Sequence, residues 1–210
     1  MKRLASIAIS AICVLSCVGS FETGNFTKEE ATLIRSTDST MRVLTITDSR
    51  DLGILRTSSS DLSEEALASE EYDRLCSLMV ATVTHPSQDG VGIAGPQVGL
   101  NRRVVAVQRF DKPGEPFEVY PNIRIVWSSD SLAAGYEGCL SVPDRREEVM
   151  RSTEIVIEYS ALCPSEDNGD GYDIQTVRET ISGFTAVIFQ HEVDHLDGVL
   201  YIDRIQPDLH

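Results

Sequence analysis

Two histidines four residues apart, in the segment His191-Glu192-Val193-Asp194-His195, constrain this chain more than any other feature. Residues at i and i+4 share one face of an α-helix, so both imidazoles can bind one metal ion, and Glu192 supplies a base beside it. The sequence predicts this helix from about residue 181 to residue 196, ending at Asp197-Gly198. Because His-Glu pairs also occur in helices by chance, the motif alone does not establish a metal site.

A candidate third ligand lies about fifty residues upstream, in Glu137-Gly138-Cys139-Leu140-Ser141. Two neutral imidazoles and one thiolate form a set of three protein ligands, which leaves a coordination position open for water and suits a catalytic site. The alternative is that Cys139 is a small buried hydrophobic residue, which is common for a free cysteine.

A glycine-rich run, Gly90-Val91-Gly92-Ile93-Ala94-Gly95-Pro96-Gln97-Val98-Gly99-Leu100, forms a third segment of interest. Its glycines permit close approach of a substrate, and the Gln97 amide is a candidate oxyanion donor. The spacing of glycines 90, 92 and 95 also matches a dinucleotide-binding fingerprint. That fingerprint requires a helix to start here, and Pro96 and Gly99 disfavour one.

Taken in order, the three segments resemble the peptide deformylase family, whose pattern is a Gly-x-Gly-Leu-Ala-Ala-x-Gln loop, Glu-Gly-Cys-Leu-Ser, and Gln-His-Glu-x-Asp-His-Leu. The second and third match without a gap, whereas the first has Ile93 for leucine and Gly95 for alanine. The resemblance extends from about Leu44 to Ile205. We expect Gly95 to loosen the loop backbone.

The resemblance implies a metal-dependent hydrolase that removes the N-formyl group from N-formylmethionyl peptides and releases formate. Cys139, His191 and His195 would hold one divalent ion, Fe²⁺ by resemblance, with Zn²⁺ or Ni²⁺ able to occupy the same site. Glu192 would take the proton from the attacking water and return it to the leaving amine. The Gln97 side chain and the Leu140 backbone N–H would stabilise the oxyanion.

Residues for the methionine side chain are expected around the first turns of the predicted metal helix. Phe184 and Val187 precede His191 by seven and four residues and share its face, and with Val91 and Gly92 they resemble the family's methionine pocket. The alternative for Phe184 and Val187 is an ordinary core position.

Three charged residues are candidates for supporting roles. Glu137 and Arg151 occupy positions that in the family resemble an ion pair behind the cysteine strand. Asp194 either orients a ligand from behind or lies on the helix surface without a role.

The sequence predicts an α+β fold, with antiparallel or mixed β-sheets packed around the metal-binding HExxH helix and a long helix earlier in the chain. That earlier helix is expected from about residue 62 to residue 84, after Asp61 as N-cap. Polar residues 164–171 indicate a hairpin turn, with a calcium loop disfavoured because the ligand spacing is missing. Strand patterns occur at residues 103–108, 118–120, 123–127, 154–159 and 172–177.

The N-terminus predicts an exported bacterial protein. Lys2-Arg3 and the apolar residues 4–15 form a stretch of signal-peptide length, and the segment ending at Cys17 resembles a lipoprotein box. Lipidation of Cys17 would attach the protein to a membrane. The alternatives are a cytoplasmic protein with a misassigned start codon, or a partly buried N-terminal segment. The expected organisation is a signal segment at 1–20, a tether or extension at 21–42, and the deformylase domain at 43–210.

The charge balance argues against one class of partner. With 33 acidic and 18 basic residues the net charge is −15, so direct nucleic-acid binding is not expected, because it depends on Lys and Arg neutralising phosphates. Two alternative functions stay open at this point: an HExxH metalloprotease that cuts internal peptide bonds, and a non-catalytic deformylase-like binding protein.

Overall fold

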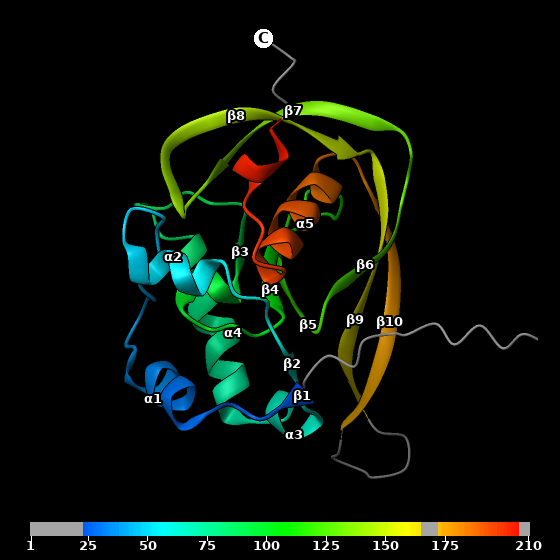
Figure 1. The fold of residues 1–210 in the computed structure, drawn as a ribbon. Helices are drawn as coiled ribbons and strands as arrows, with labels where there is room; N and C mark the ends of the chain where they lie inside the picture. Colours follow the sequence, from blue (N-terminus) through cyan, green and yellow to red (C-terminus); the bar gives the residue numbers. More distant parts are fainter. Residues whose placement is uncertain (1–22, 165–171, 206–210) are drawn as a thin grey trace, which may run out of the picture.

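The computed structural model describes residues 23–164 and 172–205. Its centre is helix α5 (Gly183–Leu196), which is surrounded by β-strands, while helices α1, α2 and α4 lie together on one side of the molecule (Figure 1). Helices and mainly antiparallel sheets are thus combined without a regular alternation of parallel strands and helices, and the predicted α+β class is confirmed.

The strands form three antiparallel units and one short parallel pair. One sheet has the order β3-β4-β5, a second has the order β10-β9-β6, β7 pairs with β8, and β1 pairs in parallel with β2. Their bounds are β1 Thr23–Gly24, β2 Asp61–Leu62, β3 Gly92–Ala94, β4 Val104–Gln108, β5 Phe117–Pro121, β6 Arg124–Ser128, β7 Leu132–Cys139, β8 Val142–Ser152, β9 Glu154–Pro164 and β10 Tyr172–Ser182.

The remaining elements are helices, most of which begin at a side-chain cap. Thr27, Asp48, Ser63 and Ser69 each accept a hydrogen bond from a backbone N–H in the first turn that follows. Their bounds are α1 Lys28–Ser36, α2 Ser49–Leu55, α3 Glu64–Leu67, α4 Glu70–Val83 and α5 Gly183–Leu196, with 3-10 turns η1 at Gly95–Val98 and η2 at Tyr201–Arg204.

Strand β4 separates two hydrophobic cores. Val104 and Ala106 pack into the core that contains α1 and α4, whereas Val105 and Val107 pack into the core that contains α5. Successive side chains of a strand point to opposite faces, so a continuous apolar run is what a strand buried on both faces requires. This arrangement places α5 directly against the β3-β4-β5 sheet.

The expected long helix at 62–84 is wrong in its first third. The chain forms the short helix α3, breaks at Ala68, and starts α4 at Glu70 because the Ser69 hydroxyl caps the new helix by accepting from the Tyr72 N–H. Asp61 is not the N-cap but part of strand β2. The second serine cap, Ser69, thus divides into two helices a stretch whose apolar residues follow one helical spacing.

The predicted strands are present and generally longer than expected, and the hairpin β7–β8 was not predicted. Strands β9 and β10 pair along their whole length, while most of the turn predicted at 164–171 lies outside the described residues. The signal segment at 1–20 also lies outside them. Among the residues described, no helix is long and apolar enough to cross a membrane.

Candidate active site

The three predicted metal ligands converge. Cys139 ends strand β7, His191 and His195 lie on α5, and their ligand atoms are all within 4.8 Å of one another. The Sγ of Cys139 is 3.2 Å from Nε2 of His195, and the two imidazole centroids are 5.1 Å apart. The spacing brings a thiolate and two ring nitrogens around one position, as a three-ligand catalytic metal site requires.

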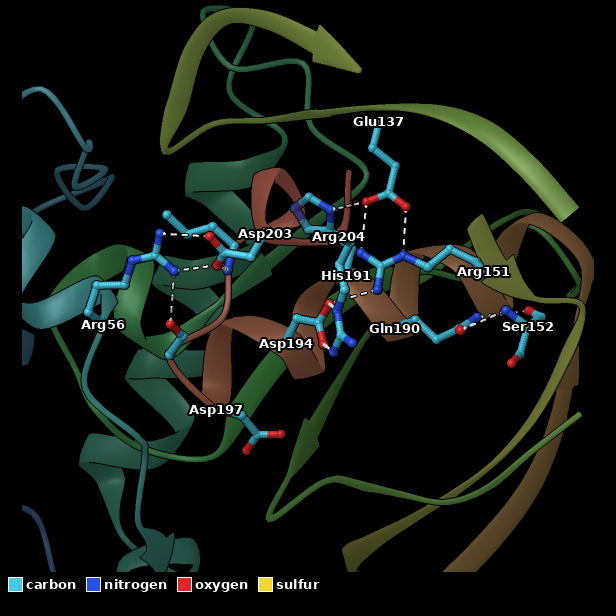
Figure 2. A network of polar contacts seen from close by, with 12 residues as sticks. Arg56, Glu137, Arg151, Ser152, Gln190, His191, Asp194, Asp197, Asp203 and Arg204 are labelled. Carbon is cyan, nitrogen blue, oxygen red and sulfur yellow. Dashed lines mark hydrogen bonds and ion pairs between the residues drawn. The ribbon is translucent and has the colours of Figure 1, made fainter. Parts of the chain in front are cut away.

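A carboxylate holds the first histidine from behind. His191 Nδ1 donates to Oε2 of Glu137 at 2.8 Å, which leaves Nε2 free to bind the ion. Arg151 in turn donates to both oxygens of Glu137, at 2.7 and 2.9 Å (Figure 2). The ion pair that the resemblance implied behind the cysteine strand is therefore present, and both side chains are buried.

The same network includes Asp194, for which the sequence left two roles open, and it has two neighbours that sequence reasoning missed. Asp194 accepts from Arg151 at 2.6 Å and from Arg204 at 2.6 and 3.1 Å, so it belongs to the support of the site and is not a surface residue (Figure 2). The ring of Tyr201 stacks on His191 at 5.8 Å between centroids. Arg204 and Tyr201 both come from η2, and no local sequence pattern predicts that this turn folds back onto α5.

The electrostatics of the site favour a positive ion. Burial lowers the pKa of His195 well below its ordinary 6.5, so this ring is neutral and can act as a ligand. Burial also acts to lower the pKa of His191, but the neighbouring Cys139 and Glu137 outweigh it and raise that pKa well above 6.5. A position that attracts a proton so strongly, beside a thiol and a neutral imidazole, fits a divalent cation.

Glu192 follows His191 directly on α5, and one of its carboxylate oxygens lacks a hydrogen-bond partner in the described part of the chain. It is 4% exposed, and its Oε2 makes no hydrogen bond among the described residues. Burial raises its pKa to about 7, which is suitable for a proton acceptor at neutral pH. Gly92 makes this placement possible, because a Cβ at that position would lie 2.5 Å from Oε1 of Glu192. A buried carboxylate oxygen without a partner is unusual in a protein and indicates a functional role for Glu192.

Gln97 is held so that its amide nitrogen faces the cysteine. Its Oε1 accepts from the Ala94 N–H at 2.8 Å, while Nε2 lies 3.2 Å from Oγ of Ser141 and 3.5 Å from Sγ of Cys139. The side chain is 1% exposed. The donor is therefore fixed before any substrate enters, as an oxyanion donor must be.

The turn that carries Gln97 is closely packed, contrary to the loosening expected from Gly95. A Cβ at Gly95 would lie 2.6 Å from the Arg102 carbonyl oxygen and 2.7 Å from that of Leu100. Glycine is needed here for close approach of the backbone.

A cavity of about 580 Å³ opens beside these groups. All four residues expected to bind substrate line it, together with the predicted oxyanion donor Leu140. Phe184 is 57% exposed, so it is not a core residue, and the same cavity reaches His191 and Glu192. The four lining residues that the sequence predicts to bind substrate are Val91, Gly92, Phe184 and Val187.

A mixed fold around a helix that brings two histidines and a distant cysteine together defines a metal-dependent hydrolase. Comparison with known proteins makes the assignment specific: residues 41–209 match the family described as polypeptide deformylase. The chain belongs to this family, whose members use a metal to remove the N-formyl group from nascent peptides. The family assignment therefore favours a deformylase over the two alternative functions that the sequence left open, a general metalloprotease and a non-catalytic binding protein.

Individual relatives agree with the assignment. The peptide deformylase of Leptospira biflexa is 35% identical over 160 residues, covering 73% of this chain and 83% of the relative. Peptide deformylase 2 of a Nostoc species is 41% identical over 137 residues, covering 62% and 70%. A class I type b enzyme from Acinetobacter baumannii, solved with Met-Ala-Ser bound, has a TM-score of 0.66 and 32% identity, covering 80% of this chain and 100% of that one.

Proposed function

We propose that this deformylase holds a single divalent ion at Cys139, His191 and His195 and uses Glu192 as its proton acceptor and donor. The observation that carries the proposal is that Gln97, Cys139, His191 and Glu192 line one cavity. The ring of His195 lies behind it, within ligand distance of Cys139 and His191. When bound, the ion lowers the pKa of a coordinated water and polarises the formyl carbonyl.

The protein's own residues divide the remaining work. Glu192 accepts the proton of the attacking water through its side-chain carboxylate and returns it to the amine that leaves. The Gln97 Nε2 and the backbone N–H of Leu140 donate to the oxygen of the formyl group as its negative charge grows. Glu137 keeps Nε2 of His191 free by accepting the proton at Nδ1.

We propose N-formylmethionyl peptides as the substrate. The cavity wall formed by Val91, Phe184 and Val187 is apolar and suits an unbranched thioether side chain. A relative from Acinetobacter baumannii binds Met-Ala-Ser, the corresponding deformylated tripeptide.

We propose ferrous iron as the resident metal, with zinc and nickel as substitutes. A cysteine and two histidines accept all three ions, so the ligands themselves do not choose among them. Oxygen sensitivity distinguishes the candidates, because a ferrous thiolate site oxidises in air and a zinc site does not.

We also propose that the protein is exported and lipidated at Cys17, on the evidence of its N-terminal sequence alone. Mass spectrometry of the mature N-terminus after cell fractionation tests this. An intact N-terminus in the cytosolic fraction would contradict it.

The function is tested by formate release from formyl-Met-Ala-Ser under anaerobic conditions, with the metal measured in the same sample. The wild-type protein is expected to release formate, and Glu192→Ala is expected to bind metal normally while losing most of the rate. If the Glu192→Ala protein turns over substrate at the wild-type rate, Glu192 is not the proton acceptor.

A further inference from the structure

The segment before the family-matched region is built into the enzyme. The match begins at residue 41, yet helix α1 lies upstream of it and packs against α4. Thr27 and Glu30 form a capping box at its start, and Ile34 is fully buried in the core. The described part of the expected tether is therefore an ordered extension of the fold.

One buried ion pair joins this extension to the rest of the protein. Arg102 donates to both carboxylate oxygens of Glu30, at 2.9 and 2.8 Å, and also to the Asn25 carbonyl oxygen at 2.7 Å. The Arg102 side chain is 9% exposed and that of Glu30 is 16% exposed. Two of the partners of this arginine thus come from residues before the matched region.

Arg102 follows the turn that carries Gln97, three residues after Gly99. The Arg102 N–H donates to Leu100 at 2.7 Å, and the Leu100 N–H donates to Gly95 at 3.0 Å. The carbonyl oxygens of Leu100 and Arg102 press against Gly95 so closely that no Cβ fits there. A displacement of the Arg102 backbone would therefore be transmitted to the turn.

The extension also contacts the turn and its outer connection. Leu33 of α1 lies 3.7 Å from the position a Cβ would take at Gly99, the residue that ends η1. The chain that leaves α1 then passes the turn, where the Leu44 N–H donates to the Gln97 carbonyl oxygen at 2.8 Å. Contacts from both α1 and its continuation thus converge on the segment 95–99.

We propose that α1 is a positioning element of the active site: Glu30, acting through Arg102, fixes the Gly95–Gly99 turn and with it the Gln97 amide. The inference rests on the proposed role of Gln97 as an oxyanion donor. It also explains why this chain has glycine where the family pattern has alanine, since the Arg102 carbonyl occupies the space that a methyl group would need.

The test compares Glu30→Gln with Arg35→Ala. Both substitutions remove an ion pair of α1. Arg35, however, pairs with Glu71 on α4, and among the described residues this pair has no hydrogen bond to Arg102 or to the turn. The Arg35 side chain is also 66% exposed. Glu30→Gln is expected to lower kcat about tenfold with KM changed less than about twofold, a smaller loss than the 10²–10³ for deleting an oxyanion donor. Arg35→Ala is expected to retain both constants.

A second measurement reports on the stability of the turn and requires neither enzyme activity nor bound metal. Amide hydrogen exchange at Leu100 and Leu44, whose N–H groups bond to the turn, is expected to accelerate in metal-free Glu30→Gln and not in Arg35→Ala. Unchanged exchange with wild-type kcat would overturn the inference, as would equal losses in both variants. If the wild-type protein releases no formate, the proposed function fails, and the exchange rates still decide whether Glu30 fixes the turn.

Discussion

Replacing Gly92 by alanine is expected to disable the enzyme without unfolding it. The new methyl group would lie 2.5 Å from Oε1 of Glu192, whereas ordinary contact begins at 3.4 Å, so the carboxylate must move by about 0.9 Å. Its Cγ and Cδ, each 2.9 Å away, would be pushed in the same direction. The clash involves the end of a side chain and not backbone, so the fold can accommodate it.

The magnitude follows from the displacement. Misplacing a reacting group by about 1 Å costs on the order of 100-fold in rate, equivalent to about 2.7 kcal/mol. We therefore expect Gly92→Ala to lower kcat for formyl-Met-Ala-Ser about 100-fold, with unchanged metal content and a Tm within about 3 °C of wild type. Gly53→Ala serves as the control, because nothing lies within 4 Å of a Cβ at that position.

A double-mutant cycle isolates the cause. If the loss arises from displacing the Glu192 carboxylate, Gly92→Ala should have little further effect on the residual rate of Glu192→Ala, because the displaced atoms are gone. A 100-fold loss that persists in the Glu192→Ala background would refute the reasoning and place the defect in substrate binding.

Two further predictions concern the network and the extension. Glu137→Gln is expected to weaken metal binding roughly 10- to 100-fold in chelator competition, because it removes the charge that holds His191 and faces Arg151; unchanged affinity would remove its supporting role. Burial acts to raise the pKa of Glu30, but Arg102 outweighs it and holds that pKa below 4.5. The pair therefore stabilises the fold fully above pH 4.5 and progressively less as the pH falls through the folded-state pKa of Glu30. The free energies of urea unfolding of metal-free wild type and Glu30→Gln should differ most at pH 7 and become equal in acid. A difference that grows as the pH falls would contradict this prediction.

The chemistry of the site could be predicted from sequence because it is encoded locally. The i, i+4 spacing of His191 and His195 determines their shared face before any tertiary structure is known. Cys139 and Gln97 needed the family pattern in addition, since no spacing rule links residues so far apart in the chain. The structure brings all four together.

What could not be predicted depends on tertiary contacts. Strand β7 is mostly exposed although it has few polar residues, and residues 144–148 of β8 are all charged. The hairpin therefore lacks the alternation that reveals a strand. Arg204 and Tyr201 reach the site only because η2 folds back after α5. The close packing at Gly95 depends on the carbonyl oxygen of Arg102, which no local pattern places there. The fold class could be predicted from the sequence more reliably than the first and last residues of each helix and strand.

The central place of α5 has a consequence for how the protein is made. The core between the β3-β4-β5 sheet and the β10-β9-β6 sheet contains Ala186, Phe189, Val193 and Leu196, all from this late helix. A ribosome emits the chain from its N-terminus, so both sheets expose their shared apolar faces until about residue 196 has left the exit tunnel. Helix α5 must therefore be synthesised before this enzyme, whose family acts on nascent peptides, can itself close its core.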